Sequence, residues 1–179
     1  ELENRYYLQK IIKRKKLLNL LKILMKKKNN IIFTGGSGKF GRVFRRLHQN
    51  MEILYPTSSQ LDIKNYKSIK KYLSKIKPKY FVHTAALSRP MNIHDRNIIN
   101  SIETNIIGTC NVVKACSEKN IKLIYFSSNY VYPAKKGYYN EKSAVLPFNN
   151  YAWSKLGGEA AVQMYKNSLI LRICMTEKP

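Results

Sequence analysis

Short apolar runs alternate along the chain with longer segments in which apolar residues recur every three or four positions. The short runs predict strands that are buried on both faces, and the longer segments predict helices that bury one face. Because strands alternate with long helices, the pattern predicts βαβ units, and with them an α/β fold built on a parallel sheet. The strands are expected at residues 31–33, 52–55, 80–83, 122–126 and 169–173.

The same pattern predicts which side of each helix is buried. One helix is expected directly after the glycine-rich segment that follows the first strand, and others at residues 64–76, 98–117 and 151–165. Pro78 is expected to end the helix at 64–76. The first helix is expected to bury Phe40, Val43, Phe44 and Leu47, and the long helix to bury Ile98, Ile102, Ile106, Val112 and Val113.

Residues 1–29 are set apart by their many Lys and Arg residues and by their lack of Gly and Pro. Their apolar residues recur at helical spacing, which predicts a basic, helical N-terminal extension. Such a helix would suit a membrane surface or a partner protein, and the alternative is an upstream extension that is not part of the domain. The domain itself is expected at residues 30–179.

The chain carries 33 Lys and Arg residues against 10 Asp and Glu residues, a formal net charge of +23. This excess favours a polyanionic partner such as nucleic acid. The basic residues are mostly Lys, however, and they spread along the whole chain beside many Asn and Ile residues, which AT-rich codons also produce. We therefore expect a dispersed, solvated basic surface, and no nucleic acid as the main partner.

Other classes of protein are disfavoured by what the sequence lacks. No apolar stretch approaches the ~18 residues of a membrane span. The cysteines, Cys110, Cys116 and Cys174, form no CxxC pair, and the histidines form no metal-ligand pattern. We expect buried, reduced thiols in a cytoplasmic protein without a metal site.

A glycine-rich segment, Thr34-Gly35-Gly36-Ser37-Gly38-Lys39-Phe40-Gly41, connects the first strand to the first helix. This spacing allows a tight turn at its first glycine, close approach of a pyrophosphate at the second, and close packing of the helix on the sheet at the third. The free N–H groups and the dipole of the helix favour phosphate binding. The segment predicts a dinucleotide site in a Rossmann-type, doubly wound sheet, and the alternative is a structural turn.

Tyr151 and Lys155 form a YxxxK pair, which places both side chains on one face of a helix. A Lys ammonium beside a phenol favours the phenolate, so we expect the pKa of Tyr151 to lie below its usual value of about 10. Ser128 follows the fourth strand, where a hydroxyl can hydrogen-bond a substrate carbonyl, because ligands bind at the carboxyl ends of such strands. The alternatives are an ordinary surface Tyr–Lys pair and a serine that caps a turn.

Together these motifs resemble those of the extended short-chain dehydrogenases/reductases, the NAD-dependent epimerase/dehydratase superfamily. Within it, the sequence is most similar to the dTDP-4-dehydrorhamnose reductase-like branch. The similarity covers residues 26–175. It rests further on Leu61-Asp62-Ile63, on residues 78–81, on Ala85-Ala86, on residues 104–109 with Asn105, on residues 127–132, and on residues 151–159.

The resemblance implies a role for each matched residue. Tyr151 would protonate the C4 oxygen of a sugar, Lys155 would hold the nicotinamide ribose, and Ser128 would polarise the ketone. The cofactor would be bound by Gly35, Gly36, Ser37, Gly38, Lys39, Phe40 and Gly41, by Asp62 and Ile63, by Ala85 and Ala86, and by Asn105, Tyr151 and Lys155.

The sequence departs from this branch at several positions. Asn129 stands where the branch has Asp, and the pair Asn129-Tyr130 lacks the Asp-Glu of related dehydratases, which argues against dehydration. Leu87–Met91 replaces an acidic, substrate-side segment of the branch. The substrate-binding portion expected after Ile173 is missing, so the identity of the substrate stays open.

These observations predict an NAD(P)H-dependent reductase of a nucleotide-linked 4-keto sugar. NADP is expected in preference to NAD, because no acid follows the second strand at residues 55–59 while Lys39 and Arg42 lie nearby. The alternatives are a 4-epimerase that retains NAD, a non-catalytic NAD(P)-binding regulatory subunit, and a basic nucleic-acid or membrane module led by residues 1–29. A homodimer is one possible assembly.

Overall fold

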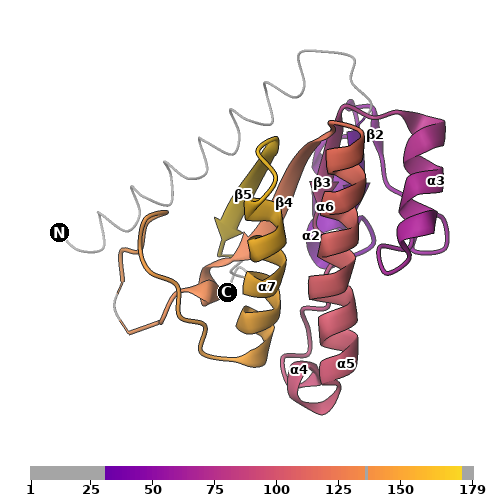
Figure 1. The fold of residues 1–179 in the computed structure, drawn as a ribbon. Helices are drawn as coiled ribbons and strands as arrows, with labels where there is room; N and C mark the ends of the chain where they lie inside the picture. Colours follow the sequence, from indigo (N-terminus) through magenta and orange to yellow (C-terminus); the bar gives the residue numbers. More distant parts are fainter. Residues whose placement is uncertain (1–30, 136, 175–179) are drawn as a thin grey trace.

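A parallel sheet of five strands forms the centre of the described part of the chain (Figure 1). The computed structural model describes residues 31–135 and 137–174. The strand order is β2-β1-β3-β4-β5, and every neighbouring pair is parallel, so the predicted sheet is confirmed. The strands are β1 (Ile31–Thr34), β2 (Ile53–Leu54), β3 (Tyr80–His83), β4 (Lys122–Ser128) and β5 (Ser168–Ile173).

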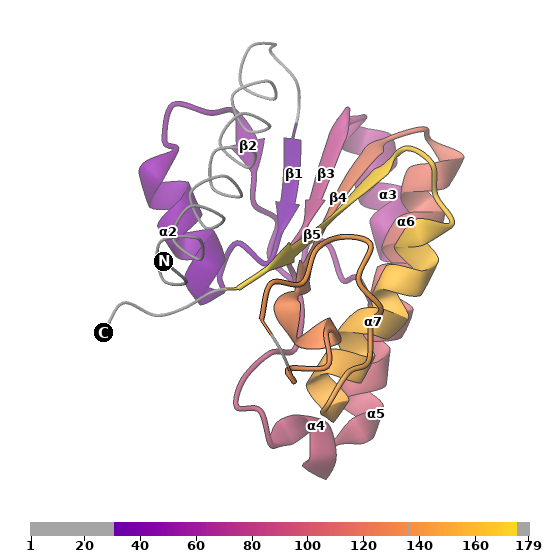
Figure 2. The same cartoon turned by 90° about the vertical axis from the view of Figure 1, so that its left-hand side faces the viewer.

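Helices lie on both faces of the sheet, as in a doubly wound fold (Figure 2). Helix α2 covers one face, and α3, α6 and α7 cover the other. The helical segments are α2 (Lys39–Leu47), α3 (Tyr66–Ile76), α4 (Ile93–Arg96), α5 (Ile98–Ser101), the π-helical η1 (Ile102–Ile107), α6 (Gly108–Glu118), the 3-10 turn η2 (Asn129–Val131) and α7 (Asn150–Gln163).

Each face of the sheet has its own hydrophobic core, because a strand sends alternate side chains to opposite faces. Under α2, Phe33 packs against Phe44 and Phe40 against Phe126, with ring centroids 5.1 Å apart in both pairs. The other core joins the sheet to the helices of the opposite layer. Its fully buried side chains include Ile32, Ile69, Leu73, Phe81, Val112, Leu123, Tyr125 and Val162.

The two crossovers that follow strand β1 lead to opposite sides of it in the sheet. The crossover through α2 leads to β2 on one side of β1, and the next crossover, through α3, leads to β3 on the other side. The carboxyl ends of β1 and β3 therefore border the switch point, the place where the strand order reverses. Ligands of open α/β sheets bind at such a point, so the topology predicts a ligand site at this edge of the sheet.

The buried face of α2 differs from the prediction. Val43 and Leu47 are 46% and 67% exposed, whereas Gly41 and Phe44 are buried. Because Gly41 faces the sheet, the buried stripe of α2 runs through Gly41 and Phe44, and Val43 and Leu47 lie on the other side. The prediction was wrong for these two residues, since a glycine adds no apolar signal to the pattern.

The long helix expected at residues 98–117 is present, but it consists of α5, η1 and α6. The wider π-helical turn of η1 interrupts the regular spacing of 3.6 residues, so an apolar pattern read across it loses register. Ile98 and Ile102 are 53% and 39% exposed, and their predicted burial was wrong. The buried stripe runs instead through small, polar and a few apolar residues: Ser101, Asn105, Gly108, Thr109, Val112, Ala115 and Cys116.

The basic helix expected at residues 1–29 lies outside the described residues. Within residues 31–135 and 137–174, no helix has the length and apolar character needed to cross a bilayer. The same residues contain no group of three His, Cys, Asp or Glu side chains arranged to hold a metal ion. Cys116 is buried, but Cys110 and Cys174 are exposed, so the expectation of three buried thiols was wrong for two of them.

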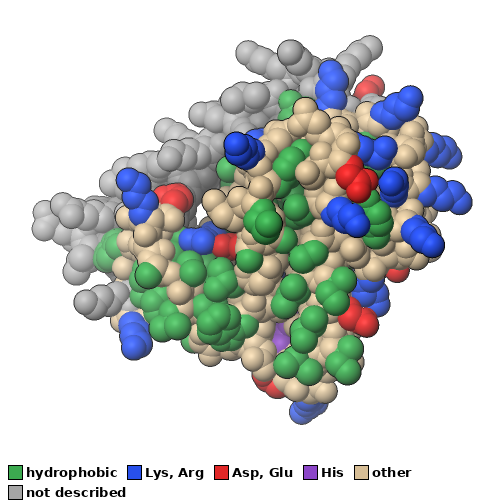
Figure 3. All heavy atoms as spheres, in the orientation of Figure 1, with side chains coloured by type: hydrophobic (Ala, Val, Ile, Leu, Met, Phe, Trp, Pro, Cys, Tyr) green, Lys and Arg blue, Asp and Glu red, His purple; other side chains and the backbone are tan. Residues whose placement is uncertain are grey.

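Charged and apolar side chains occupy different parts of the surface (Figure 3). On the face shown, Lys and Arg gather over α3, and hydrophobic side chains gather over α5 and the loop that leads into α7. The exposed side chains of α3 include Lys67, Lys70, Lys71 and Lys75, and those of the apolar areas include Ile98, Ile99, Leu146 and Phe148.

Candidate active site

The glycine-rich segment forms a tight turn between β1 and α2 at the switch point. Gly35 has a φ of +80°, and a Cβ atom there would lie 2.5 Å from Thr84 Oγ1. A Cβ atom on Gly41 would lie 2.3 Å from Gly35 O. Both approaches are closer than atoms tolerate, so these positions require glycine. The turn therefore presents bare backbone, as the approach of a pyrophosphate would require.

The N-terminus of α2 is suited to an anion. No side chain caps this end of the helix, and no acidic residue lies in its first turn. Ser37, Gly38 and Lys39 are exposed there, whereas Phe40 is half-buried against the aromatic core. Free N–H groups and the positive end of the helix dipole would therefore face a phosphate group. Together with the bare turn, these residues fit the pyrophosphate of a dinucleotide.

The segment after β3 runs beside this turn. Thr84 donates hydrogen bonds from both N and Oγ1 to Thr34 O, at 3.3 and 2.7 Å. A Cβ atom on Gly35 would lie 2.7 Å from Ala85 N, so Ala85 packs directly on the turn. Ala86 follows it and is half-buried. Both predicted alanines thus lie at the switch point.

Asn105, in η1, holds the next part of this segment. Its Oδ1 accepts a hydrogen bond from Leu87 N, and its Nδ2 donates to Leu87 O and to Ser154 Oγ, all at 2.8 Å. Both amide hydrogens are used in these bonds. Asn105 therefore supports the Leu87 segment and joins it to α7, and it offers no free donor to a cofactor.

Asp62 and Ile63 lie in the turn before α3. Asp62 Oδ1 accepts a hydrogen bond from Lys64 N at 2.9 Å, and its side chain remains partly exposed. Ile63 is buried in the core, where its Cδ1 would lie 2.9 Å from a Cβ atom on Gly108. The structure thus places Ile63 in the packing between α6 and the sheet, and leaves Asp62 accessible.

Tyr55 stands at the carboxyl end of β2, where enzymes that prefer NAD often have an acid. Its ring covers Gly36, because a Cβ atom on Gly36 would lie 2.8 Å from Tyr55 Cδ1. Arg45 of α2 stacks on the same ring, with Cζ 5.3 Å from the ring centroid. A cation therefore lies beside the end of β2. The sequence pointed to Lys39 and Arg42 for this part of the site and did not single out Arg45.

Ser128, at the end of β4, and Tyr151, in the first turn of α7, come together in the fold. Ser128 lies close enough to Tyr151 to influence the pKa of its phenol, and Ser128 Oγ accepts a hydrogen bond from Tyr130 N at 3.2 Å. Asn149 caps α7, because its Oδ1 accepts from Ala152 N at 2.8 Å. This cap fixes where α7 begins, and with it the position of Tyr151 beside Ser128.

The pKa of Tyr151 moves in the opposite direction to the one expected. Burial raises it above its usual value, while the nearby Ser128 hydroxyl and the charge of Arg89 lower it by less. The ring of Tyr130 lies edge-on to the ring of Tyr151, with centroids 6.0 Å apart. The expected lowering of the pKa was wrong, because the loss of water around the phenol outweighs its polar neighbours.

Lys155 is buried one turn after Tyr151 on α7. Its Nζ lies 4.3 Å from the ring centroid of Tyr125, whose OH donates to Lys155 O at 3.3 Å. Burial lowers the pKa of Lys155 to about 7, against the opposing effect of the Glu159 carboxylate. Burial and the charge of Lys155 lower the pKa of His83 to about 3. The ammonium of Lys155 is therefore close to its ionisation midpoint at neutral pH.

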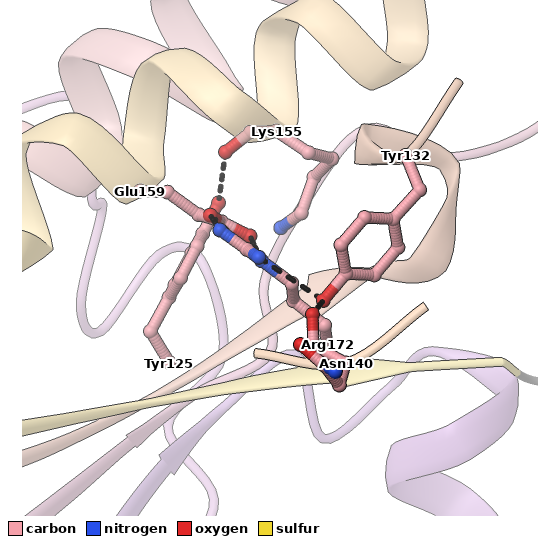
Figure 4. Close-up of polar contacts among 6 residues, drawn as sticks. All are labelled: Tyr125, Tyr132, Asn140, Lys155, Glu159 and Arg172. Carbon is pink, nitrogen blue, oxygen red and sulfur yellow. Dashed lines mark hydrogen bonds and ion pairs between the residues drawn. The ribbon is translucent and has the colours of Figure 1, made fainter. Parts of the chain in front are cut away.

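The buried Glu159 forms an ion pair near Lys155 with Arg172, which is partly buried (Figure 4). Arg172, on β5, donates to the Glu159 carboxylate from Nη2 at 2.7 Å and from Nε at 3.1 Å. Its Nη1 donates to Tyr132 OH at 3.1 Å, and Tyr132 OH donates to Asn140 O at 2.8 Å. The bonds connect α7 to β5 and to the loop after β4. The sequence included Glu159 in a matched segment but did not indicate Arg172 as its partner.

His94, on α4, is a second group near the site that the sequence did not single out. It is 1% exposed, and its ring centroid lies 5.1 Å from that of Tyr151. Its Nδ1 lies 2.7 Å from Ser101 Oγ, and its buried Nε2 has no hydrogen-bond partner among the described residues. Burial lowers the pKa of His94 more than Asp95 raises it. A neutral imidazole therefore packs against the phenol.

The sequence also matches a known protein family and several known proteins. Residues 29–176 match the model of the family described as the RmlD substrate binding domain. The chain is 28% identical over 152 residues to methionine adenosyltransferase 2 subunit beta of Xenopus laevis, which covers 79% of this chain and 45% of that protein. It is 30% identical over 144 residues to GDP-6-deoxy-D-talose 4-dehydrogenase of Aggregatibacter actinomycetemcomitans, which covers 76% of this chain and 48% of that protein.

Solved structures show the same likeness. The dTDP-4-dehydrorhamnose reductase of Bacillus anthracis, solved in complex with NADP, superposes with a TM-score of 0.76 at 27% identity. The superposition covers 82% of this chain and 53% of the reductase chain. The chain therefore spans about half the length of the relatives that it matches.

Proposed function

Because the chain belongs to the RmlD substrate binding domain family, we propose that it is an NAD(P)H-dependent reductase of a nucleotide-linked 4-keto sugar. The observation that carries this proposal is that Ser128 and Tyr151 lie close together at the carboxyl end of the sheet. The bare backbone at Gly35 and Gly41 supports the cofactor part, as does the NADP in the similar reductase of Bacillus anthracis. NADP is the preferred form, because Arg45 is a cation at the end of β2.

Each residue of the site would have its own role in the reaction, and bound NAD(P)H would supply the hydride. Ser128 would donate a hydrogen bond to the C4 ketone oxygen, and Tyr151 would transfer its phenolic proton to that oxygen. A phenol with a raised pKa is protonated at neutral pH, which suits this role as an acid. Lys155, when protonated, would hydrogen-bond the cofactor ribose and stabilise the phenolate that Tyr151 becomes.

Cofactor binding is tested by the thermal stability of the chain with NADPH and with NADH. A ligand at a hundred times its dissociation constant stabilises the folded state by about 2.7 kcal/mol, which raises Tm by a few degrees. We expect the larger shift with NADPH, and a smaller difference between the two cofactors after Arg45→Ala. No shift with either cofactor would contradict the proposed site.

Catalysis is tested by following NADPH oxidation in the presence of nucleotide-linked 4-keto sugars. We expect Tyr151→Phe to lower turnover by about 10²–10⁴-fold, the usual contribution of a positioned general acid. The thermal shift with NADPH should stay unchanged in this variant. Tyr66→Phe, on α3, is the matched control, since it also removes one phenol hydroxyl. Unchanged turnover in Tyr151→Phe would contradict the assigned role.

A second candidate is a non-catalytic NAD(P)-binding subunit of another enzyme. One observation favours it: the Xenopus laevis relative is named as a subunit. NADPH binding without turnover of any keto sugar would support this candidate over the reductase. A third reading, a 4-epimerase, would be supported by NAD that stays bound through purification.

A further inference from the structure

Glu159 lies one helical turn after Lys155 on α7, and both side chains are only 3% exposed. Residues four positions apart share one face of a helix, so both charged side chains leave α7 on the same side. Figure 4 shows both side chains leaving α7 on the side that faces β5 and Arg172. Two adjacent, buried, opposite charges are costly to keep in a protein interior unless other groups compensate them.

Arg172 supplies that compensation for Glu159. Its Nε lies 3.1 Å from each carboxylate oxygen, and its Nη2 lies 2.7 Å from one of them. A fork of this kind fixes the orientation of a carboxylate as well as its charge. Arg172 is fixed in turn by Tyr132, whose OH accepts from its Nη1 at 3.1 Å and whose ring lies 5.1 Å from its Cζ.

Lys155 has no such direct partner among the described carboxylates. Its Nζ faces the ring of Tyr125 at 4.3 Å, which offers only a cation–π contact. Without help, a fully buried ammonium would favour its neutral form. The fixed carboxylate of Glu159 opposes this tendency, and it is the effect that raises the pKa of Lys155 against the lowering by burial.

The other titratable and charged groups around Lys155 are not negative at neutral pH. Burial holds the pKa of His83 at about 3 and raises the pKa of Tyr125 far above its usual value, so both stay neutral. The pKa of Tyr151 is raised as well. The groups that face Lys155 or its neighbour Tyr125 are His83 of β3, Cys110 of α6, Tyr125 of β4, Tyr151 and Glu159 of α7, and Arg172 of β5.

We propose that Glu159, held by Arg172, is a positioning residue that keeps Lys155 protonated, so that Lys155 can bind the cofactor ribose as an ammonium. This inference rests on the proposed function, because it assigns Lys155 to the nicotinamide cofactor. It adds that the affinity for NAD(P)H depends on pH through one buried lysine, and that Glu159 sets the pH at which affinity is lost.

The test is the dissociation constant of NADPH, measured by calorimetry from about pH 5.5 to pH 9. For the unchanged chain, we expect affinity to fall as the pH rises through about 7, where Lys155 loses its proton. In Glu159→Gln, this fall should begin at lower pH, and affinity at neutral pH should drop by about tenfold or more, since a neighbouring opposite charge moves a pKa by 1–3. At the acid end of the range, the difference in affinity between the variant and the unchanged chain should become smaller.

Two further variants separate charge from folding. Glu159→Gln leaves the partly buried Arg172 without its carboxylate, which can destabilise the fold, so the double variant Glu159→Gln with Arg172→Met removes both charges together. The double variant should show the same shift to lower pH. Tyr132→Phe is the matched control, because it removes one bond to Arg172 and leaves Glu159 paired. Its pH profile should match that of the unchanged chain.

Two results would overturn the proposal: a profile in Glu159→Gln with the original midpoint, or an equal loss of affinity at every pH. The second result would mean that Glu159 only supports the fold. The ionisation of Lys155 is followed separately by the NMR signal of its labelled Cε, which reports the midpoint without cofactor. A midpoint that moves in Glu159→Gln, in a chain that binds no NADPH at any pH, would reject the proposed function while keeping the coupling between the two side chains.

Discussion

His83, at the end of β3, is a fully buried histidine with hydrogen bonds to both ring nitrogens. Nδ1 lies 2.9 Å from Thr34 Oγ1, and Nε2 lies 3.2 Å from Thr109 Oγ1. Thr109 donates its own proton to Asn105 O at 2.7 Å, so it accepts from His83. The imidazole therefore carries its proton on Nε2 and accepts from Thr34 at Nδ1. This neutral form is fully satisfied, and a second proton would add a charge beside Lys155.

These contacts make the stability of the fold depend on pH. The pKa of His83 is about 3 in the folded chain and about 6.5 in the unfolded chain. Below pH 6.5 the unfolded state therefore binds a proton that the folded state does not bind. The free energy of unfolding should fall with decreasing pH, by up to about 1.4 kcal/mol per pH unit from this residue. Between pH 6.5 and 5, Lys155 is protonated in both states and adds little to the slope.

The measurement is urea unfolding at pH 7, 6 and 5, for the unchanged chain and for His83→Asn. The variant should be less stable at pH 7, because it cannot bridge both threonines, but its stability should fall less steeply toward pH 5. His94, which burial also keeps neutral, contributes to both chains alike, so the difference in slope belongs to His83. Equal slopes in the two chains would show that His83 is protonated in the folded state.

Among the residues of the site, those in local motifs were predictable from the sequence. The spacing of Tyr151 and Lys155 and the place of Ser128 after a strand indicated a shared location, and the fold brings Ser128 and Tyr151 into contact. The raised pKa of Tyr151 was not predictable, because burial depends on segments that are distant in the sequence. The partners Arg172 of Glu159 and Ser101 of His94 lack any motif for the same reason.

At the scale of elements, strands were easier to predict than helix faces. Tyr80–His83 matches the expected strand end to end, because a strand buried on both faces has an unbroken apolar run. Helix faces failed where the buried side contains glycine or polar residues. Asn105 and Thr109 are buried because their hydrogen bonds are satisfied, and no apolar pattern records this.

The ends of α3 illustrate how local chemistry sets an element. Asn65 caps the helix, since its Oδ1 accepts from Ser68 N at 3.2 Å. Asn65→Ala should lower the free energy of unfolding by about 1 kcal/mol, because it leaves that amide without its side-chain acceptor. Urea unfolding midpoints at constant m-value measure this change.

Asn65→Asp is the matched control, since it keeps an acceptor at the cap and places a negative charge at the positive end of the helix dipole. It should be as stable as the unchanged chain or more stable. At the other end of α3, Lys77 has a φ of 51°, so Lys77→Gly should stabilise the fold by up to about 1 kcal/mol. Equal stability of the Ala and Asp variants at residue 65 would contradict the capping role.

At the scale of the whole molecule, charge and architecture act together. The net charge of +23 creates a positive potential around the fold, and both NAD(P)H and nucleotide sugars are anions that such a potential attracts. The excess Lys and Arg residues also repel one another. The exposed ion pairs among the described residues, Lys64 with Glu103 at 3.9 Å and Lys70 with Glu118 at 3.5 Å, contribute only about 0–1 kcal/mol each.

Repulsion among the basic residues should therefore outweigh attraction within the exposed ion pairs, and salt should stabilise the fold. Raising NaCl from about 0.01 M to 0.15 M shortens the Debye length from about 30 Å to about 8 Å, which screens repulsion between distant lysines more than attraction within a contact pair. We expect Tm to rise over this range, and sodium acetate at equal ionic strength to act like NaCl, because screening depends on ionic strength rather than on the anion.

A Tm that falls with salt would show that local ion pairs, with Arg172–Glu159 foremost, dominate the electrostatics of the fold. In that case the positive excess would be too dispersed to matter for stability, and the attraction of anionic ligands would depend on the few cations at the switch point.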